Sequence, residues 1–374
     1  MTTTATAIRA GILRRRLVQQ LTRDGALRSR FWHEAFSTVP RELFVPRFTR
    51  REGSDLVTYR AGDPDYLTAV YSNTSLNTRY DIHGTAVSSS SQPSMMARMC
   101  EALAPVNDRL PVLDLGTGPG YNAALLCHRY GSDRVVSRDV DPDIVTDAAK
   151  HLAMAGYSPT LTLGNGAEGC PGNAPYGALI ATYGTGRIPE AWRHQVARGG
   201  NIVANLGHGL VALTIGDHRS ATGHFLPVLA AFMQARPNAN AAPAPARTYA
   251  GKVATATGHT QEIELPANPG EDMPQFLGSL VHPDVVDFSL LLDGKSVHCL
   301  AHPRSSSWAR ITPGPDGTAR LNHGGPRNLW AERAPLISRW SAAGEPTADA
   351  YSLTVYPTGQ HELRLGDAFW SLPE

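Results

Sequence analysis

Hydrophobic residues near the middle of the chain change from a short continuous run to a helical repeat, with a glycine-rich break between them. Residues 112–115 are apolar except for Asp114, a pattern typical of a buried parallel strand. Gly116, Gly118 and Gly120 follow at alternate positions, and residues 121–130 carry apolar side chains at helical spacing. Glycine permits a sharp turn and the close approach of a ligand to the backbone. The pattern therefore predicts the opening strand, turn and helix of a nucleotide-binding βαβ unit.

The spacing of the three glycines argues against a dinucleotide. In the fingerprint G-x-G-x-x-G the third glycine comes one residue later, where this chain has Tyr121. Asp114 is expected at the carboxyl end of the strand, where a carboxylate repels a pyrophosphate but suits an ammonium group. Asp139 ends a second apolar run 23 residues after Gly116, the offset expected for an acidic residue that binds ribose hydroxyls. We therefore expect S-adenosylmethionine, which is cationic and lacks phosphate; the alternative is a glycine-rich turn that binds nothing.

Two stretches before the glycine turn combine apolar residues with proline. Residues 39–46, Val-Pro-Arg-Glu-Leu-Phe-Val-Pro, predict a fixed, packed turn because two prolines enclose the apolar positions. Residues 88–93 are four serines followed by glutamine and proline, and helical periodicity follows over 95–103. Serine before proline is ordinary helix capping, and residue types alone favour that interpretation. Residues 8–26 predict an amphipathic helix with its arginines on a solvated face.

The second half of the chain predicts a linker and a smaller domain. Small residues and prolines without core-forming side chains make 236–247 a linker. Beyond it we expect an α+β domain without a catalytic or zinc site, in which four tryptophans supply core. The elements predicted after the glycine turn are strands within 201–215 and 223–233, alternating runs at 289–299 and 319–321 around a turn at Pro315, a helix over 331–342 and a hairpin over 351–365.

Composition limits the class of protein. The 374 residues suffice for one large or two ordinary domains, and the net charge of +1 gives no reason to expect nucleic acid or an anionic membrane as partner. The four cysteines form no C-x-x-C pair, and the histidines lack metal-ligand spacing, so no metal is expected. The chain has no apolar stretch of membrane-spanning length and no secretory signal, so we expect a soluble, cytoplasmic protein.

Several motifs together resemble the protein-L-isoaspartate O-methyltransferase family. The resemblance covers about residues 8–203, and the serine-glutamine-proline segment and the proline-bracketed turn are its most specific parts. Its motifs are residues 39–46, Ser-Gln-Pro at 91–93, 112–124, Leu-Gly-Asn-Gly at 163–166, 174–180, Arg-Ile-Pro at 187–189 and 199–203. The resemblance implies an α/β, Rossmann-like S-adenosylmethionine-dependent methyltransferase core. The domains expected are a catalytic domain over 1–235, the linker over 236–247 and an α+β domain over 248–374 for recognition of a peptide substrate.

The resemblance also assigns site residues. It implies that Ser91 is the catalytic-loop hydroxyl, with Ser89 and Ser90 beside it, over the methyl donor and the acceptor carboxylate. A carboxylate is ionised at pH 7 and needs no general base, so one orienting hydroxyl suffices. The residues expected to bind the cofactor are Gln92, Asp114, Gly116, Thr117, Gly118, Gly120, Tyr121, Asp139, Val140, Asn165, Gly166 and Ala167.

Two positions depart from the family pattern. Asn165 stands where the family has an acidic residue that helps to hold the adenine; its amide oxygen still accepts a hydrogen bond, without charge. Tyr183 is bulky where the family has a small residue, and it either reshapes the acceptor pocket, as a substrate-binding residue, or simply packs.

The C-terminal extension resembles variants that modify ribosomally made peptides such as graspetides, lanthipeptides and lasso peptides. That resemblance implies methylation of an aspartate in a macrocyclic precursor peptide, followed by loss of methanol to a backbone nitrogen and closure to a succinimide (aspartimide). Two alternatives stay open: general repair of isoaspartyl proteins, and a non-catalytic peptide-binding partner of a maturation enzyme.

Overall fold

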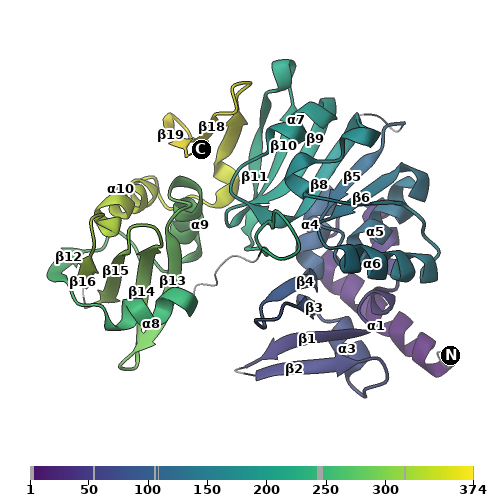
Figure 1. Cartoon of the computed structure of the whole chain (residues 1–374), viewed down its shortest axis with the longest axis horizontal. Coiled ribbons are helices and arrows are strands. Elements are labelled where there is room, and N and C mark those ends of the chain that lie inside the picture. Colours follow the sequence, from purple (N-terminus) through teal and green to yellow (C-terminus); the bar gives the residue numbers. More distant parts are fainter. Residues whose placement is uncertain are drawn as a thin grey trace.

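The centre of the molecule is a mixed ten-stranded sheet (Figure 1). The computed structural model describes residues 4–53, 55–104, 107, 109–241, 247–315 and 317–373. Along the sheet the strand order is β19-β18-β17-β11-β10-β9-β8-β5-β6-β7. The parallel part, which is typical of nucleotide-binding folds, consists of β5 (Val112–Leu115), β6 (Val135–Asp139), β7 (Thr160–Leu163), β8 (Tyr176–Thr185) and β9 (Val196–Leu206). The predicted strand, turn and helix are therefore confirmed, with α5 (Tyr121–Tyr130) following the glycines.

The alternation of side chains along β5 directs its residues into two separate cores. Val112 packs with residues of the N-terminal helices and α5, whereas Leu113 and Leu115 pack on the other face with Trp192. The helices of the first face are α1 (Thr4–Arg23), α2 (Arg30–Thr38), α4 (Pro93–Ala102), α5 and α6 (Pro142–Met154); α7 (Glu190–Gln195) carries Trp192 on the second face. A helix was predicted over 8–26, and α1 begins and ends a few residues earlier.

A second, four-stranded sheet lies beside the main one and carries the serine segment. Its order is β2-β1-β3-β4, and it is drawn at the bottom of Figure 1. The elements are β1 (Arg47–Glu52), β2 (Asp55–Arg60), α3 (Tyr66–Val70), β3 (Leu76–Tyr80) and β4 (Ala86–Ser90). The predicted packed turn at 39–46 contains one 3-10 turn, Arg41–Leu43.

The C-terminal region contains a five-stranded antiparallel sheet. Its order is β12-β16-β15-β14-β13, with helices packed on it. Its elements are α8 (Arg247–Thr255), β12 (His259–Glu264), α9 (Asp272–Val281), β13 (Val286–Leu292), β14 (Lys295–His302), β15 (Ser307–Pro313), β16 (Thr318–Gly324) and α10 (Leu329–Ala342). The run predicted at 289–299 is two strands, because Asp293 and Gly294 turn the chain with positive φ. Of the predicted linker, 242–246 lie outside the described residues, as does Asp316 of the turn at Pro315.

The last three strands leave this region and return to the main sheet. The predicted hairpin forms as β17 (Ser352–Val355) and β18 (His361–Leu365), but β17 pairs with β11 (Ala221–Leu229), and β19 (Ala368–Leu372) completes the edge. In this sheet, β10 (Gly209–Ile215) and β9 lie between β11 and β8. Residues 352–372 are thus part of the same sheet as the predicted catalytic domain, and the boundary predicted at 248 did not anticipate this.

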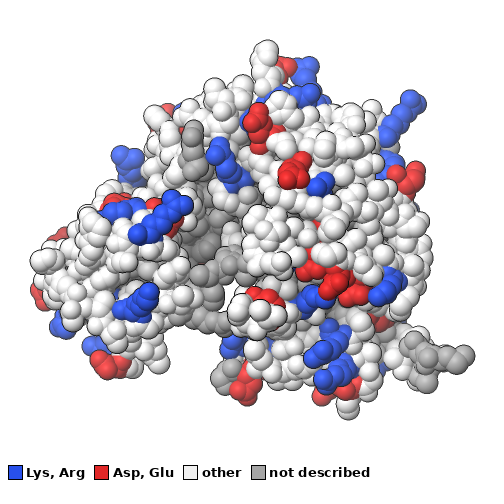
Figure 2. All heavy atoms as spheres, viewed as in Figure 1, with Lys and Arg blue, Asp and Glu red and all other residues white. Residues whose placement is uncertain are grey.

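Apolar packing joins the two regions. Phe276 of α9 lies edge-on to Phe225 of β11, with ring centroids 4.9 Å apart, and also contacts Tyr351. Figure 2 shows acidic and basic side chains interspersed on the face in view. Within the part of the chain that the structure describes, no helix combines the length and apolar character needed to cross a bilayer.

Candidate active site

A cavity of about 630 Å³ opens at the carboxyl ends of β5, β6 and β8. This is where open α/β sheets bind ligands, and the volume suits a small organic molecule. Its wall is formed by the serine segment, the glycine turn, the loop after β7, the end of β8 and residues 229–236, which we call the strap.

The glycine turn brings the backbone against its neighbours on both sides. Gly116 and Gly118 have positive φ, and both line the cavity. A Cβ on Gly116 would lie 2.9 Å from Oγ1 of Thr182, and one on Gly118 would lie 3.3 Å from the carbonyl oxygen of Ser89. The turn therefore links the end of β8 to the serine segment; a Cβ on Gly116 would require its neighbours to shift, and one on Gly118 would press on the backbone of Ser89.

Other residues predicted around this turn lie behind the wall. Gly120 has φ of 98° and faces the apolar side chains of Leu152 and Phe44, so it shapes and packs the turn. Tyr121 packs on Phe44 and, like Thr117, reaches a small cavity beneath the main one. Gly120, predicted to bind the cofactor, does not line the main cavity, because its neighbours are core residues.

Asp139 lies in the cavity wall at the end of β6. Its Oδ2 accepts a hydrogen bond of 3.0 Å from the N–H of Gly118, and its Oδ1 accepts one of 2.8 Å from the N–H of Val140. Burial raises the pKa of this carboxyl, while these N–H donors and nearby Arg236 act in the opposite direction. Asp139 and Val140, both predicted to bind the cofactor, thus line the cavity.

Asp114 does not occupy the place predicted for it. The alternation of β5 turns its side chain toward α5, where it has no exposed surface and lines neither of the two cavities described above. Its oxygens accept hydrogen bonds of 2.7 Å from Asn122 and Ser137. Because Ser137 is bonded to Thr117, which reaches the small cavity, Asp114 supports the turn from behind instead of contacting a ligand directly.

The loop after β7 forms another part of the wall. Asn165 and Gly166 line the cavity, whereas Ala167 does not. The side-chain oxygen of Asn165 accepts a hydrogen bond of 2.9 Å from the N–H of Ala167, so it holds the loop.

Tyr183 stands between the two segments predicted to hold the cofactor. A Cβ on Gly166 would lie 2.3 Å from its hydroxyl oxygen, and one on Gly116 would lie 3.1 Å from its ring. The hydroxyl is buried without a hydrogen-bond partner among the described residues, and burial raises its pKa. These surroundings place Tyr183 against the glycine turn and the loop after β7.

Three of the four serines in the segment 88–91 line the main cavity, and Ser90 reaches only the small cavity beneath it. Ser89 and Ser91 line the main cavity together with Gln92. Ser90 has only 2% of its surface exposed, and its hydroxyl accepts a hydrogen bond from Arg41. Of the three serines predicted to be catalytic, two are therefore presented to the cavity, and Ser90 has a supporting position.

The strap was not predicted. It follows β11, which ends at Leu229 and not at residue 233 as expected. Hydrogen bonds hold it across the cavity: Gly184 donates to Met233 at 2.8 Å, Ala235 donates to Gly184 at 2.8 Å, and Asn205 bonds both Ala230 and Phe232. The sequence pattern predicted 230–233 as the end of a strand and did not indicate these contacts.

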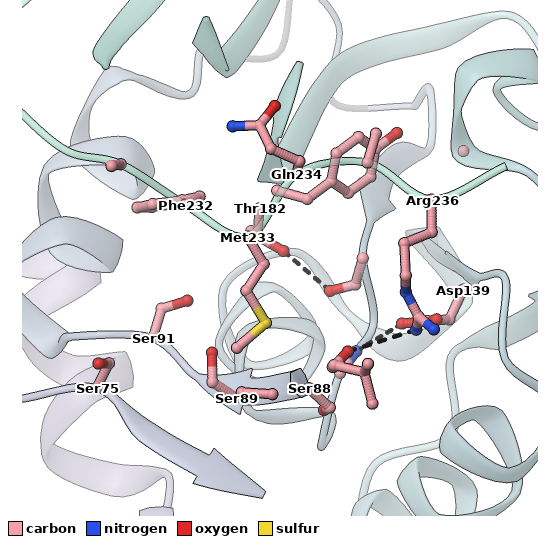
Figure 3. A pocket seen from close by; sticks show the side chains of 18 of the residues that line it. Ser75, Ser88, Ser89, Ser91, Asp139, Thr182, Phe232, Met233, Gln234 and Arg236 are labelled. Carbon is pink, nitrogen blue, oxygen red and sulfur yellow. Dashed lines mark hydrogen bonds between the residues drawn. The ribbon is translucent and has the colours of Figure 1, made fainter. Parts of the chain in front are cut away.

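The cavity has a polar end and a mixed end (Figure 3). Asp139 and Arg236 lie together at one end, whereas Ser75, Ser89 and Ser91 lie at the other. Met233 of the strap points toward Ser89 from across the cavity. The arrangement provides a carboxylate for hydroxyl groups at one end and neutral donors beside apolar surface at the other.

Comparisons with known proteins agree with this geometry. The family model described as protein-L-isoaspartate(D-aspartate) O-methyltransferase matches residues 13–220. The chain is 31% identical over 210 residues to a protein-L-isoaspartate O-methyltransferase of Hyperthermus butylicus, covering 52% of this chain and 75% of the relative. It is 30% identical over 236 residues to the protein of that name in Staphylothermus marinus, covering 58% and 93%.

A solved structure extends the likeness at the level of fold. A chain titled protein-L-isoaspartate O-methyltransferase superposes with a TM-score of 0.54 and 22% identity, covering 94% of this chain and 99% of that one. The similarity in fold thus includes most of the C-terminal region.

Proposed function

The chain belongs to the protein-L-isoaspartate(D-aspartate) O-methyltransferase family, and from that premise we propose that it esterifies the free carboxylate of isoaspartyl residues in peptides and proteins, using S-adenosylmethionine. One observation carries this proposal: Ser89 and Ser91 line the same cavity as Asp139 and the glycine turn. A methyl donor and an acceptor carboxylate can therefore meet within one enclosed space.

The residues of the cavity fit the methyl donor. Asp139 is the carboxylate for the ribose hydroxyls, and the exposed backbone of Gly116 and Gly118 admits the amino-acid part without steric conflict. Val140, Asn165 and Tyr183 would border the adenine. When bound, the cofactor supplies a methyl group on a sulfonium, whose sulfur leaves as a neutral thioether.

The acceptor end needs only to orient and desolvate an anion. A carboxylate is a nucleophile at pH 7, so no proton has to move, and none of the serines acts as a base. We assign to Ser91 a hydrogen bond that aims one carboxylate oxygen, with Ser89 beside it. Phe232 and Met233 of the strap exclude water, which strengthens that alignment.

A second candidate is tailoring of a ribosomal peptide. There the acceptor is an aspartate of a macrocyclic precursor, and the ester closes to a succinimide with loss of methanol. The strap is the reason to consider this candidate, because Met233 points toward Ser89 and the strap lies beyond residues 13–220, which match the family model. The C-terminal region does not separate the candidates, because a solved structure with the family's name has a similar fold over 94% of the chain.

One assay separates the candidates. The protein is incubated with S-adenosylmethionine and a linear isoaspartyl peptide, its aspartyl isomer, or a macrocyclic aspartyl peptide, and mass is followed. Methylation of the isoaspartyl peptide alone supports repair; methylation of the macrocycle alone, followed by loss of methanol, supports tailoring. Cofactor binding without methylation of any peptide contradicts both and supports a peptide-binding partner.

A further inference from the structure

Arg41 lies directly behind the serine segment and is fully buried. Its Nε donates to Oγ of Ser90 at 3.1 Å, and Nη2 donates to the carbonyl oxygens of Ser90 and Ser91 at 3.1 and 3.0 Å. The remaining hydrogen bonds go to the carbonyls of Val70, Ser72 and Thr74. One guanidinium thus connects the serine segment to the chain between α3 and β3.

No carboxylate neutralises this charge among the residues that the structure describes. Glu42, the next residue, accepts hydrogen bonds from Arg14 and Tyr71 instead. All the acceptors of Arg41 are carbonyl or hydroxyl oxygens. Burial lowers the pKa of Arg41 to about 10, so it is still charged at neutral pH.

Burying a cation costs free energy, and hydrogen bonds to neutral oxygens offset this cost without neutralising the charge. Removing an anionic acceptor from water is equally costly, and the serines offer it only neutral donors. Arg41 lies behind the cavity wall, and the charged side chains in the wall itself are Arg138, Asp139 and Arg236. Arg236 lies at the opposite end, beside Asp139 (Figure 3).

We propose that Arg41 is a positioning and specificity-determining residue: its fork fixes Ser90 and Ser91, and its unpaired charge makes the acceptor end select an anion over a neutral group. This rests on the function proposed above. A buried unit charge favours a carboxylate held nearby over a neutral isostere, and a preference of about tenfold is a modest estimate for such a pair.

The experiment compares two peptides that differ only in charge. One has an isoaspartyl residue with its free carboxylate, and the other has a carboxamide at that position. Binding is measured by calorimetry to protein saturated with S-adenosylhomocysteine, whose sulfur is uncharged, so that any preference comes from the protein. We expect the wild type to bind the carboxylate peptide about tenfold more tightly.

Two substitutions of Arg41 separate the effect of its charge from the effect of the hydrogen bonds that its planar guanidinium fork donates to the serine segment. Arg41→Gln is expected to bring the affinity ratio near one, whereas Arg41→Lys keeps most of the ratio but lowers kcat, because a lysine cannot reproduce the fork. Arg14→Gln, which removes a nearby arginine that does not contact the serine segment, is the matched control and is expected to keep the wild-type ratio.

Two results overturn the proposal. One is a wild-type ratio near one. The other is a ratio unchanged in Arg41→Gln; if that variant does not fold, an Arg41→Lys protein with wild-type kcat contradicts the positioning role. A wild type that binds the two peptides with the expected ratio but transfers no methyl group rejects the proposed function and leaves the role of Arg41 in anion selection standing.

Discussion

The N–H of Gly118 donates to Oδ2 of Asp139 at 3.0 Å, which ties the glycine turn after β5 to the end of β6. Asp139→Asn removes the charge and, in either amide orientation, sets an NH₂ group against a backbone N–H donor, because both carboxylate oxygens accept hydrogen bonds from backbone N–H groups. We predict that it weakens binding of S-adenosylhomocysteine by about tenfold or more, measured by calorimetry. Asp143→Asn, a change on the exposed surface of α6, is the control; equal affinities for both variants would remove Asp139 from the cofactor site.

Ser91, which lines the acceptor end of the cavity, predicts that methyl transfer and cofactor binding respond differently to substitution. Ser91→Ala removes a hydrogen bond to an anionic acceptor, and we expect kcat to fall roughly 10- to 100-fold. Affinity for S-adenosylhomocysteine should change much less, because the hydroxyl lies at the other end of the cavity. Ser132→Ala, a substitution just after α5, is the control for effects of removing a serine hydroxyl outside the cavity. A Ser91→Ala enzyme with wild-type kcat would exclude the orienting role.

The contact between Gly118 and Ser89 predicts a steric effect on activity. Gly118→Ala places a methyl group 3.3 Å from the carbonyl of Ser89, at a positive φ. Gly156 also has positive φ, but a Cβ added there would have no neighbour within 4 Å, so Gly156→Ala shares only the backbone strain. Both variants should lose about 1 kcal/mol of stability. Only Gly118→Ala should also lose cofactor affinity and kcat, and parallel activities in the two variants would contradict the proposed geometry.

The buried carboxyl of Asp114 predicts a pH-dependent stability. Burial raises its pKa from 3.8 to about 6, so the folded state holds the carboxyl proton of Asp114 more tightly than the unfolded chain does. Its contribution to stability is therefore present below pH 3.8 and is lost as pH rises through 6.

The side chain of Asn in the Asp114→Asn variant cannot ionise, so the variant should not lose stability in this way as pH rises. Relative to the variant, the free energy of unfolding of the wild type should fall by on the order of 2–3 kcal/mol between about pH 4 and pH 7. Urea unfolding at several pH values measures the difference, with Asp143→Asn as the surface control. A difference between wild type and Asp114→Asn that is independent of pH would show that Asp114 does not titrate in this way.

Local signals explain which parts of the site could be predicted. The glycines at 116 and 118 and the apolar run before them determine a turn within a few residues, and Asp139 follows at a fixed offset. Asp114 was misplaced because the offset alone does not say which face of a strand a side chain occupies. Its neighbours Leu113 and Leu115 fill the opposite face, so Asp114 lies under α5.

Long-range contacts explain what could not be predicted. The hairpin at 351–365 has a clear alternating pattern, yet pattern alone does not choose between the edge of its own domain and that of β11. The strap depends on Asn205 and Gly184, which are distant in sequence and belong to other strands. Similarly, Arg41 was part of a motif identified in the sequence, but its contact with Ser91, 50 residues later, appears only in the folded chain.

The central claim is that one cavity holds the methyl donor and the acceptor carboxylate together. A crystal structure of the protein with S-adenosylhomocysteine and an isoaspartyl peptide tests it most directly. The account predicts ribose hydroxyls on Asp139 and the free carboxylate of the peptide hydrogen-bonded to Ser91. A nucleoside bound elsewhere, or a peptide carboxylate remote from Ser89 and Ser91, would contradict it.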